Sequence, residues 1–110
     1  MKYHKQLSLQ KWSDMSLAVK MANVGSEVIR AMKWKDEGNE AYGSLAFARS
    51  LELIDMSIEA EEEKARLKEW CRLREMWVDY WWGENQYQSK REQWQQYFFQ
   101  FTYLARMRAN

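Results

Sequence analysis

Apolar residues recur every three or four positions along most of the chain, which is the spacing of amphipathic α-helices. Four such segments are predicted, and short polar or glycine-containing stretches separate them. They run over Asp14–Glu37, Glu40–Glu59, Glu62–Trp82 and Ser89–Arg108. Four amphipathic helices with short connections predict an all-α fold, and specifically an antiparallel up-and-down four-helix bundle. Residues 1–12 have weak periodicity and are predicted to form an N-terminal arm, pinned by Leu7, Leu9 and Trp12.

Residues with capping or turn preferences mark the expected helix ends. Ser13 is the predicted N-cap of the first helix, and the pair Gly38-Asn39 is expected to stop it and to cap the second. Gly83 is expected to end the third helix, and Ser89–Glu92 reads as a capping box for the fourth. The acidic stretch Glu59–Glu63 contains no strong helix breaker, so the second and third helices are either separated by a short turn or barely interrupted.

The second predicted helix is apolar on two sides. One face carries Tyr42, Leu45, Ala46, Leu53 and Met56, and the other carries Phe47, Leu51, Ile54 and Ile58. Such a helix either lies at the centre of a bundle or also packs on a second copy of the chain. On the fourth helix, Phe99 and Tyr103 lie away from the main apolar stripe, which predicts exposed aromatic rings. Both features predict a homodimer whose interface includes Phe47, Leu51, Ile54, Ile58, Phe99 and Tyr103.

The composition supports a helical protein. The 110 residues include no proline and four glycines, and 46% of them are hydrophobic, which is enough for the core of a single domain over residues 1–110. The net charge of +1 gives no overall attraction to nucleic acid, and no apolar run is long enough to cross a membrane. A single cysteine and the absence of an apolar signal segment predict a cytoplasmic location.

Two arginines are the candidate ligand-binding residues. Arg74 lies among apolar positions of the third predicted helix, near the middle of a stripe formed by Trp70, Cys71, Trp77, Val78 and Trp81. Arg49 lies on an apolar face of the second helix, and Glu52 and Asp55 are possible carboxylate partners. One interpretation is a buried ion pair, or an arginine whose stem crosses a tryptophan to reach water. The other is a cleft in which Arg49, Glu52 and Arg74 bind phosphate or carboxylate.

The sequence contains no recognisable catalytic constellation. His4 is the only histidine, so neither a nucleophile–histidine pair nor a helical metal site is expected. No cofactor and no metal are predicted, and Cys71 is expected to be an inert residue of the core. The exposed aromatic rings therefore indicate a protein interface or a platform for base stacking, and the near-neutral charge favours the interface.

The segment Arg74–Tyr80, REMWVDY, resembles the signature of HEPN domains, which are small helical bundles of bacteria and archaea. Their pattern is an arginine, a polar residue, apolar residues, a histidine and a nearby tyrosine; Arg74, Glu75 and Tyr80 take three of these positions. The likeness spans Leu67–Arg106 and includes the polar loop and last amphipathic helix. It implies a role in toxin–antitoxin systems, with a nucleotidyltransferase as possible partner and ribonuclease activity in active members.

Asp79 stands where these families place the histidine. A carboxylate is a poor replacement for an imidazole that exchanges protons near neutral pH, and Arg74 and Asp79 point about 140° apart on an uninterrupted helix. Arg74 and Asp79 are therefore expected to bind rather than to catalyse. The predicted function is a non-catalytic HEPN-like interaction module that binds a partner protein, or a nucleotide or RNA. The alternatives are a HEPN-type ribonuclease and a purely structural homodimeric bundle.

Overall fold

The computed structural model of the protein describes residues 2–108, which form five α-helices and no strand. These are α1 (Leu9–Ser13), α2 (Leu17–Asp36), α3 (Glu40–Ala60), α4 (Lys64–Trp81) and α5 (Arg91–Arg108). The all-α prediction is confirmed, and each of the four predicted helices is present with ends shifted by a few residues. The additional helix, α1, lies in the predicted arm. Met1, Ala109 and Asn110, which belong to the predicted domain, lie outside the described residues.

The first predicted cap is wrong, because the chain turns before the long helix begins. Ser13 ends α1, and Asp14 is the C-cap of that short helix. Ser16 is the N-cap of α2, and its side chain accepts a hydrogen bond from the Val19 N–H at 3.2 Å. The extra cap separates Trp12 from α2, which lets this side chain turn into the core.

Capping residues define the turns between the long helices. Gly38 adopts a φ of 78°, which favours glycine, and Asn39 caps α3 by accepting from the Tyr42 N–H at 3.1 Å. A real turn separates α3 from α4, where the Glu63 side chain accepts from the N–H groups of Ala65 and Arg66.

The capping box predicted at Ser89–Glu92 is wrong. Ser89 is buried and its hydroxyl donates to the Asn85 side chain, while the Gln93 side chain accepts from the Lys90 N–H at 2.8 Å. Helix α5 therefore starts at Arg91, where an ion pair between Arg91 and Asp36 ties it to the end of α2.

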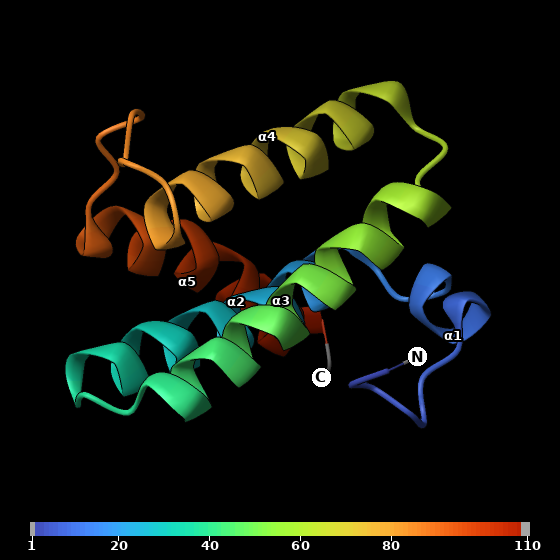
Figure 1. The fold of residues 1–110 in the computed structure, drawn as a ribbon. Coiled ribbons are helices and arrows are strands. Elements are labelled where there is room, and N and C mark those ends of the chain that lie inside the picture. Colours follow the sequence, from blue (N-terminus) through green and yellow to red (C-terminus); the bar gives the residue numbers. More distant parts are fainter. Residues whose placement is uncertain (1, 109–110) are drawn as a thin grey trace.

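Helix α2 is the common support of the fold, since it packs against both α3 and α5, while α3 also packs against α1 and α4 (Figure 1). In Figure 1, α4 runs from right to left above α3. Helix α5 runs from left to right and lies below α4. The approach of α5 to α2 is close at Gly25, where an added Cβ would lie 2.7 Å from Phe98. The absence of a side chain at Gly25 therefore lets α5 approach α2 closely. Within residues 2–108, no helix is long and apolar enough to span a membrane.

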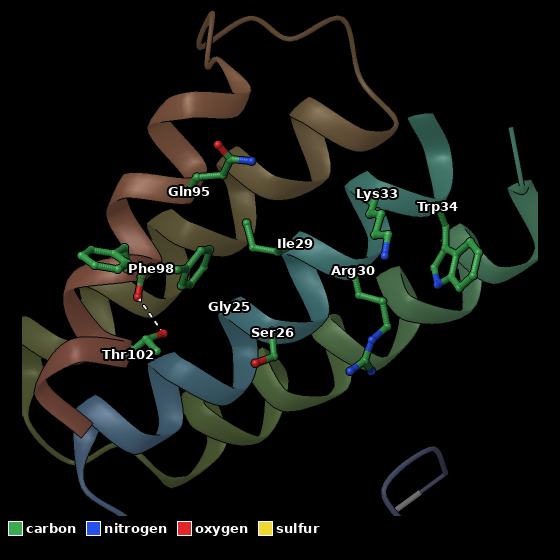
Figure 2. Close-up of a pocket in the computed structure, with 10 residues that line it drawn as sticks. Gly25, Ser26, Ile29, Arg30, Lys33, Trp34, Gln95, Phe98 and Thr102 are labelled. Carbon is green, nitrogen blue, oxygen red and sulfur yellow. Dashed lines mark hydrogen bonds between the residues drawn. The ribbon is translucent and has the colours of Figure 1, made fainter. Parts of the chain in front are cut away.

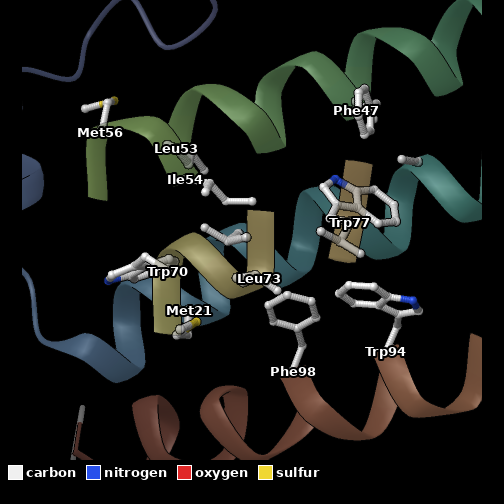
Figure 3. Packing of buried hydrophobic residues seen from close by; sticks show 14 of the residues in the cluster. Met21, Phe47, Leu53, Ile54, Met56, Trp70, Leu73, Trp77, Trp94 and Phe98 are labelled. Atoms are coloured by element: carbon white, nitrogen blue, oxygen red, sulfur yellow. The ribbon is translucent and has the colours of Figure 1, made fainter. Parts of the chain in front are cut away.

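The core is one cluster to which all five helices contribute (Figure 3). Its fully buried large side chains include Trp12, Trp70, Trp77 and Phe47. The expectation that Cys71 lies in the core is wrong, because α4 turns other residues inward and Cys71 is exposed. On α4 the buried positions are Trp70, Leu73 and Trp77.

Two serines on α3 accept hydrogen bonds from buried indoles. The Trp77 Nε1–H of α4 donates to Ser50 Oγ at 2.8 Å, and the Trp12 Nε1–H of α1 donates to Ser57 Oγ at 2.9 Å. Each serine hydroxyl in turn donates to a carbonyl one turn back on α3, from Ser50 to Phe47 and from Ser57 to Leu53. Both serines are almost fully buried, so no water competes for these bonds. These contacts join α1 and α4 to α3 at fixed positions.

Ser50→Ala is expected to lower the free energy of unfolding by about 1–3 kcal/mol, because it leaves the Trp77 indole N–H buried without an acceptor. Ser57→Ala is expected to have a similar effect through Trp12. Ser44→Ala, at an exposed position of the same helix, is the matched control and should change stability little. Urea denaturation followed by circular dichroism measures the three effects. A Ser50→Ala protein as stable as the Ser44→Ala control contradicts the assigned role.

Candidate functional site

Arg74 forms a surface ion pair between two helices. Its Nε donates to Asp55 Oδ1 of α3 at 2.7 Å, and the two side chains are 42% and 53% exposed. The expected burial of Arg74 in the α4 stripe is wrong, because the buried direction of α4 passes through Leu73 and Trp77. Asp55 was one of the two expected carboxylate partners, but the ion pair lies at the surface and is not buried.

Glu52 holds the N-terminal arm. Its carboxylate accepts hydrogen bonds from the N–H groups of Tyr3 and His4, at 2.9 and 3.0 Å, and lies 3.2 Å from His4 Nδ1. Partial burial raises the pKa of Glu52, but these hydrogen bonds outweigh it, so the pKa lies below its usual value. Arg49 is half-buried on the same helix and makes no side-chain hydrogen bond or ion pair within residues 2–108.

Asp79 organises the loop between α4 and α5. Its carboxylate accepts from the N–H groups of Gln86, at 2.9 Å, and Tyr87, at 3.2 Å. Gly83 lies against it, since a Cβ there would be 2.8 Å from the Asp79 carbonyl oxygen. Asp79 thus has a structural role at the position where the HEPN signature has its histidine.

The four candidate ligand-binding residues do not form one site. Among residues 2–108, no hydrogen bond or ion pair joins any two of Arg49, Glu52, Arg74 and Asp79. Arg74 and Asp79 have separate partners, on α3 and in the α4–α5 loop. This separation is what the five-residue spacing on a regular helix predicts.

The predicted interface residues divide into two groups. Phe47 and Ile54 are 2% and 0% exposed in the core, so their assignment to an intermolecular interface is wrong. Leu51 and Ile58 are partly buried and pack against that core. At Phe47 this face of α3 meets α4 of the same chain, since the centroid of the Phe47 ring lies 5.4 Å from that of Trp77 and 5.1 Å from that of Trp81. By contrast, Phe99 and Tyr103 are exposed, at 69% and 55%.

The outer face of α5 is the most distinctive surface of the described residues. Residues 93–105 carry no charged side chain, although 30% of the whole chain is charged. Phe99, Tyr103 and Met107 are exposed along this helix, and Gln96 precedes them on the same side. A surface with few charged residues and with exposed aromatic rings is typical of the centre of protein interfaces. The absence of charge over residues 93–105 is visible in the sequence and is a signal that would have indicated this surface directly.

A groove of about 570 Å³ lies beside this face, between α2 and α5 (Figure 2). Ile29 of α2 points toward α5, and Gln95 and Phe98 lie opposite it. Phe99 and Thr102 form the outer edge on α5, and Arg30 and Lys33 form a basic end on α2. An exposed aromatic ring and a hollow of suitable size therefore occur next to each other on one face. Comparisons with protein families, with curated proteins and with solved structures found no match to this chain.

Acid is expected to release the N-terminal arm. The pKa of Glu52 is lower in the folded chain, so its bonds stabilise docking above the unfolded pKa, and this stability is lost as pH falls through the folded pKa. Amide hydrogen exchange at Tyr3 and His4 between about pH 5 and pH 2 measures the release. Glu52→Gln should weaken docking and remove the carboxylate's contribution to its pH dependence. Glu59→Gln, an exposed position on the same helix, is the control; equal behaviour of the two variants contradicts the assignment.

Arg74→Ala is expected to lower the free energy of unfolding by less than about 1 kcal/mol, because solvent screens an ion pair that is about half exposed. Asp55→Ala should cost a similar amount, and the double variant little more than either alone. Thermal and urea denaturation of the three variants measure these effects. A loss of several kcal/mol would mean that Arg74 is a buried structural residue after all.

Proposed function

We propose that the protein is a non-catalytic helical interaction module that pairs with a second copy of itself through the outer face of α5. The observation that carries the proposal is the uncharged, aromatic outer face, on which Phe99 and Tyr103 are exposed. Rings of this size on a charge-depleted helix are favourable anchors for a protein partner and unfavourable in water.

The spacing along α5 supports pairing of like faces. Glu92, Gln96, Phe99, Tyr103 and Arg106 are all exposed and follow one another at intervals of four and three residues, as the seam residues of a coiled coil do. Phe99 is the midpoint of this series. An antiparallel pair with its two-fold axis at Phe99 therefore stacks the two Phe99 rings at the centre.

Charge favours a second copy as the partner. A two-fold interface brings identical surfaces together, so any charge near the axis meets a like charge. Residues 93–105 avoid this repulsion because they carry no charge. The only charged seam residues, Glu92 and Arg106, have opposite signs and lie at opposite ends, so antiparallel pairing brings unlike charges together. The groove beside Phe99 offers additional room for aromatic rings from the other copy.

The HEPN-like relationship is retained as part of the proposal, with a nucleotidyltransferase as a possible second partner. Arg74 and Asp79 are each held by structural partners, and this arrangement favours the binding role over the ribonuclease alternative. The net charge of +1 lends no support to RNA as the main ligand.

We also propose that the four long helices constitute a single up-and-down bundle domain, acting in the cytoplasm. The support for one domain is the single core cluster that receives side chains from every described helix. The short turns at residues 37–39 and 61–63 support alternating directions of successive helices.

Replacing Phe99 and Tyr103 together by glutamine is expected to weaken self-association by about tenfold or more, because both anchor rings are lost. Sedimentation velocity over a range of protein concentrations measures the dimer dissociation constant. Trp82→Gln is the matched control, since Trp82 is 70% exposed and lies at the end of α4, away from α5's outer face.

Circular dichroism should give the same helical signal for the variants and the natural chain. A natural chain that stays monomeric at the highest attainable concentration contradicts self-association. A dimer that survives loss of both rings but dissociates with Trp82→Gln would place the interface elsewhere.

A further inference from the structure

A second hollow, of about 770 Å³, lies between α4, the α4–α5 loop and the first turns of α5. Its apolar lining comes from Leu73 and Met76 of α4 and from Trp94 and Tyr97 of α5. Leu73 and Trp94 are almost fully buried, so they continue the core to the wall of this groove. Phe99 and Tyr103 do not line it, so this inference does not depend on self-association.

Trp94 carries a hydrogen-bond donor that has no acceptor. It is 4% exposed, and its Nε1 is buried without a hydrogen-bond partner among residues 2–108. In Figure 3 the nitrogen of the Trp94 ring lies on the side away from Phe98. The indoles of Trp12 and Trp77 are equally buried, and each has its serine. The Trp70 indole is also buried without an acceptor, but Trp70 does not line this groove. A buried donor without an acceptor is rare in folded proteins, so this indole is an unusual feature of the groove wall.

Positive charge lies at the mouth of the same groove. Lys68 and Arg72 are one turn apart on α4, and both line the opening. Burial raises the pKa of Tyr97, and so does the hydrogen bond from its hydroxyl to Glu69 at 2.6 Å, whereas the charge of Arg72 opposes this rise. Arg72 also opposes the raised pKa of Tyr87, which arises mainly from its hydrogen bond to Glu75. The guanidinium is thus close to tyrosines on both sides of the opening.

The charged residues that line this groove favour the binding of an anion. Glu69 is the one carboxylate among the lining residues, and Tyr97 already donates to it, while Lys68 and Arg72 make no ion pair within residues 2–108. The walls meanwhile favour a flat apolar body, because the indole of Trp94 and the ring of Tyr97 both lie along the groove.

We propose that this groove binds a small aromatic carboxylate. The ring of the ligand lies against Trp94 and Tyr97, and its carboxylate binds the cations at the mouth, chiefly Arg72. Arginine suits this role because its guanidinium donates two parallel hydrogen bonds to a carboxylate.

The test uses three probes with the same ring system and different head groups: 2-naphthoate, 2-naphthalenemethanol and 2-naphthylmethylamine. Each is titrated into the ¹⁵N-labelled full chain, and the indole Nε1–H resonances are followed by NMR, with Trp94→Phe identifying the Trp94 signal. The proposal expects 2-naphthoate to shift the Trp94 signal in a saturable way and to bind at least about fivefold more tightly than the alcohol or the amine.

Arg72→Gln should weaken 2-naphthoate binding by about fivefold while leaving binding of the alcohol unchanged. Arg66→Gln is the matched control, because Arg66 lies on the same helix, is 53% exposed and does not line the groove. Equal affinities for the three probes, an unmoved Trp94 signal, or equal effects of Arg72→Gln and Arg66→Gln would each overturn the proposal. The same titration on the Phe99/Tyr103 glutamine variant separates this result from the state of self-association.

Discussion

The fold depends on α3 providing hydrogen-bond acceptors for indoles that other helices bury. A large aromatic side chain gains more from burial when its polar atom is also satisfied, as it is for two of the buried indoles of this protein. Ser50 and Ser57 meet this condition for Trp77 and Trp12, and they lie seven residues apart, so both project from one side of α3. Each hydroxyl gives its own proton to an α3 carbonyl, which leaves its oxygen free to accept from the indole. The positions of α1 and α4 along α3 are thereby specified by hydrogen bonds as well as by packing.

The helices themselves were readable from the sequence, because local chemistry decides them. The Gly38-Asn39 turn was predicted correctly, since a residue with positive φ followed by an N-cap residue needs no information from distant parts of the chain. The rotation of α4 about its own axis was not predicted correctly. Centring its apolar stripe on Arg74 placed the buried face about 60–70° from its actual direction. Trp81 and Val78 suit either rotation, and only the position of Ser50 on another helix selects the one that buries Trp77.

The roles of the charged residues were the least predictable part. Arg74, Glu52 and Asp79 were recognised as unusual, yet each role is set by a partner that the local pattern does not specify. Arg74 meets Asp55 nineteen residues away, and Glu52 meets the backbone of Tyr3 forty-nine residues away. Asp55 had been considered as a partner, but nothing in the sequence chose it over Glu52. The exposed aromatics of α5 were predicted more easily, because a residue opposite the core face of a helix needs only the helical period to be located.

Helix α5 packs closely against α2 but leaves a groove toward α4. Both candidate surfaces, the outer face of α5 and the α4–α5 groove, therefore involve this helix. At Gly25 the absence of a side chain lets Phe98 lie directly against α2. Toward α4 the contact is made by large rings instead, with the Trp94 centroid 5.4 Å from that of Trp77 and 5.9 Å from that of Tyr80. Rings of this size hold the two backbones apart, and the space beside them is the α4–α5 groove. The Trp94 donor on α5 has no serine of the kind that α3 offers to Trp12 and Trp77. The aromatic residues thus build the core on α3 and, on α5, produce an exposed aromatic face and a groove.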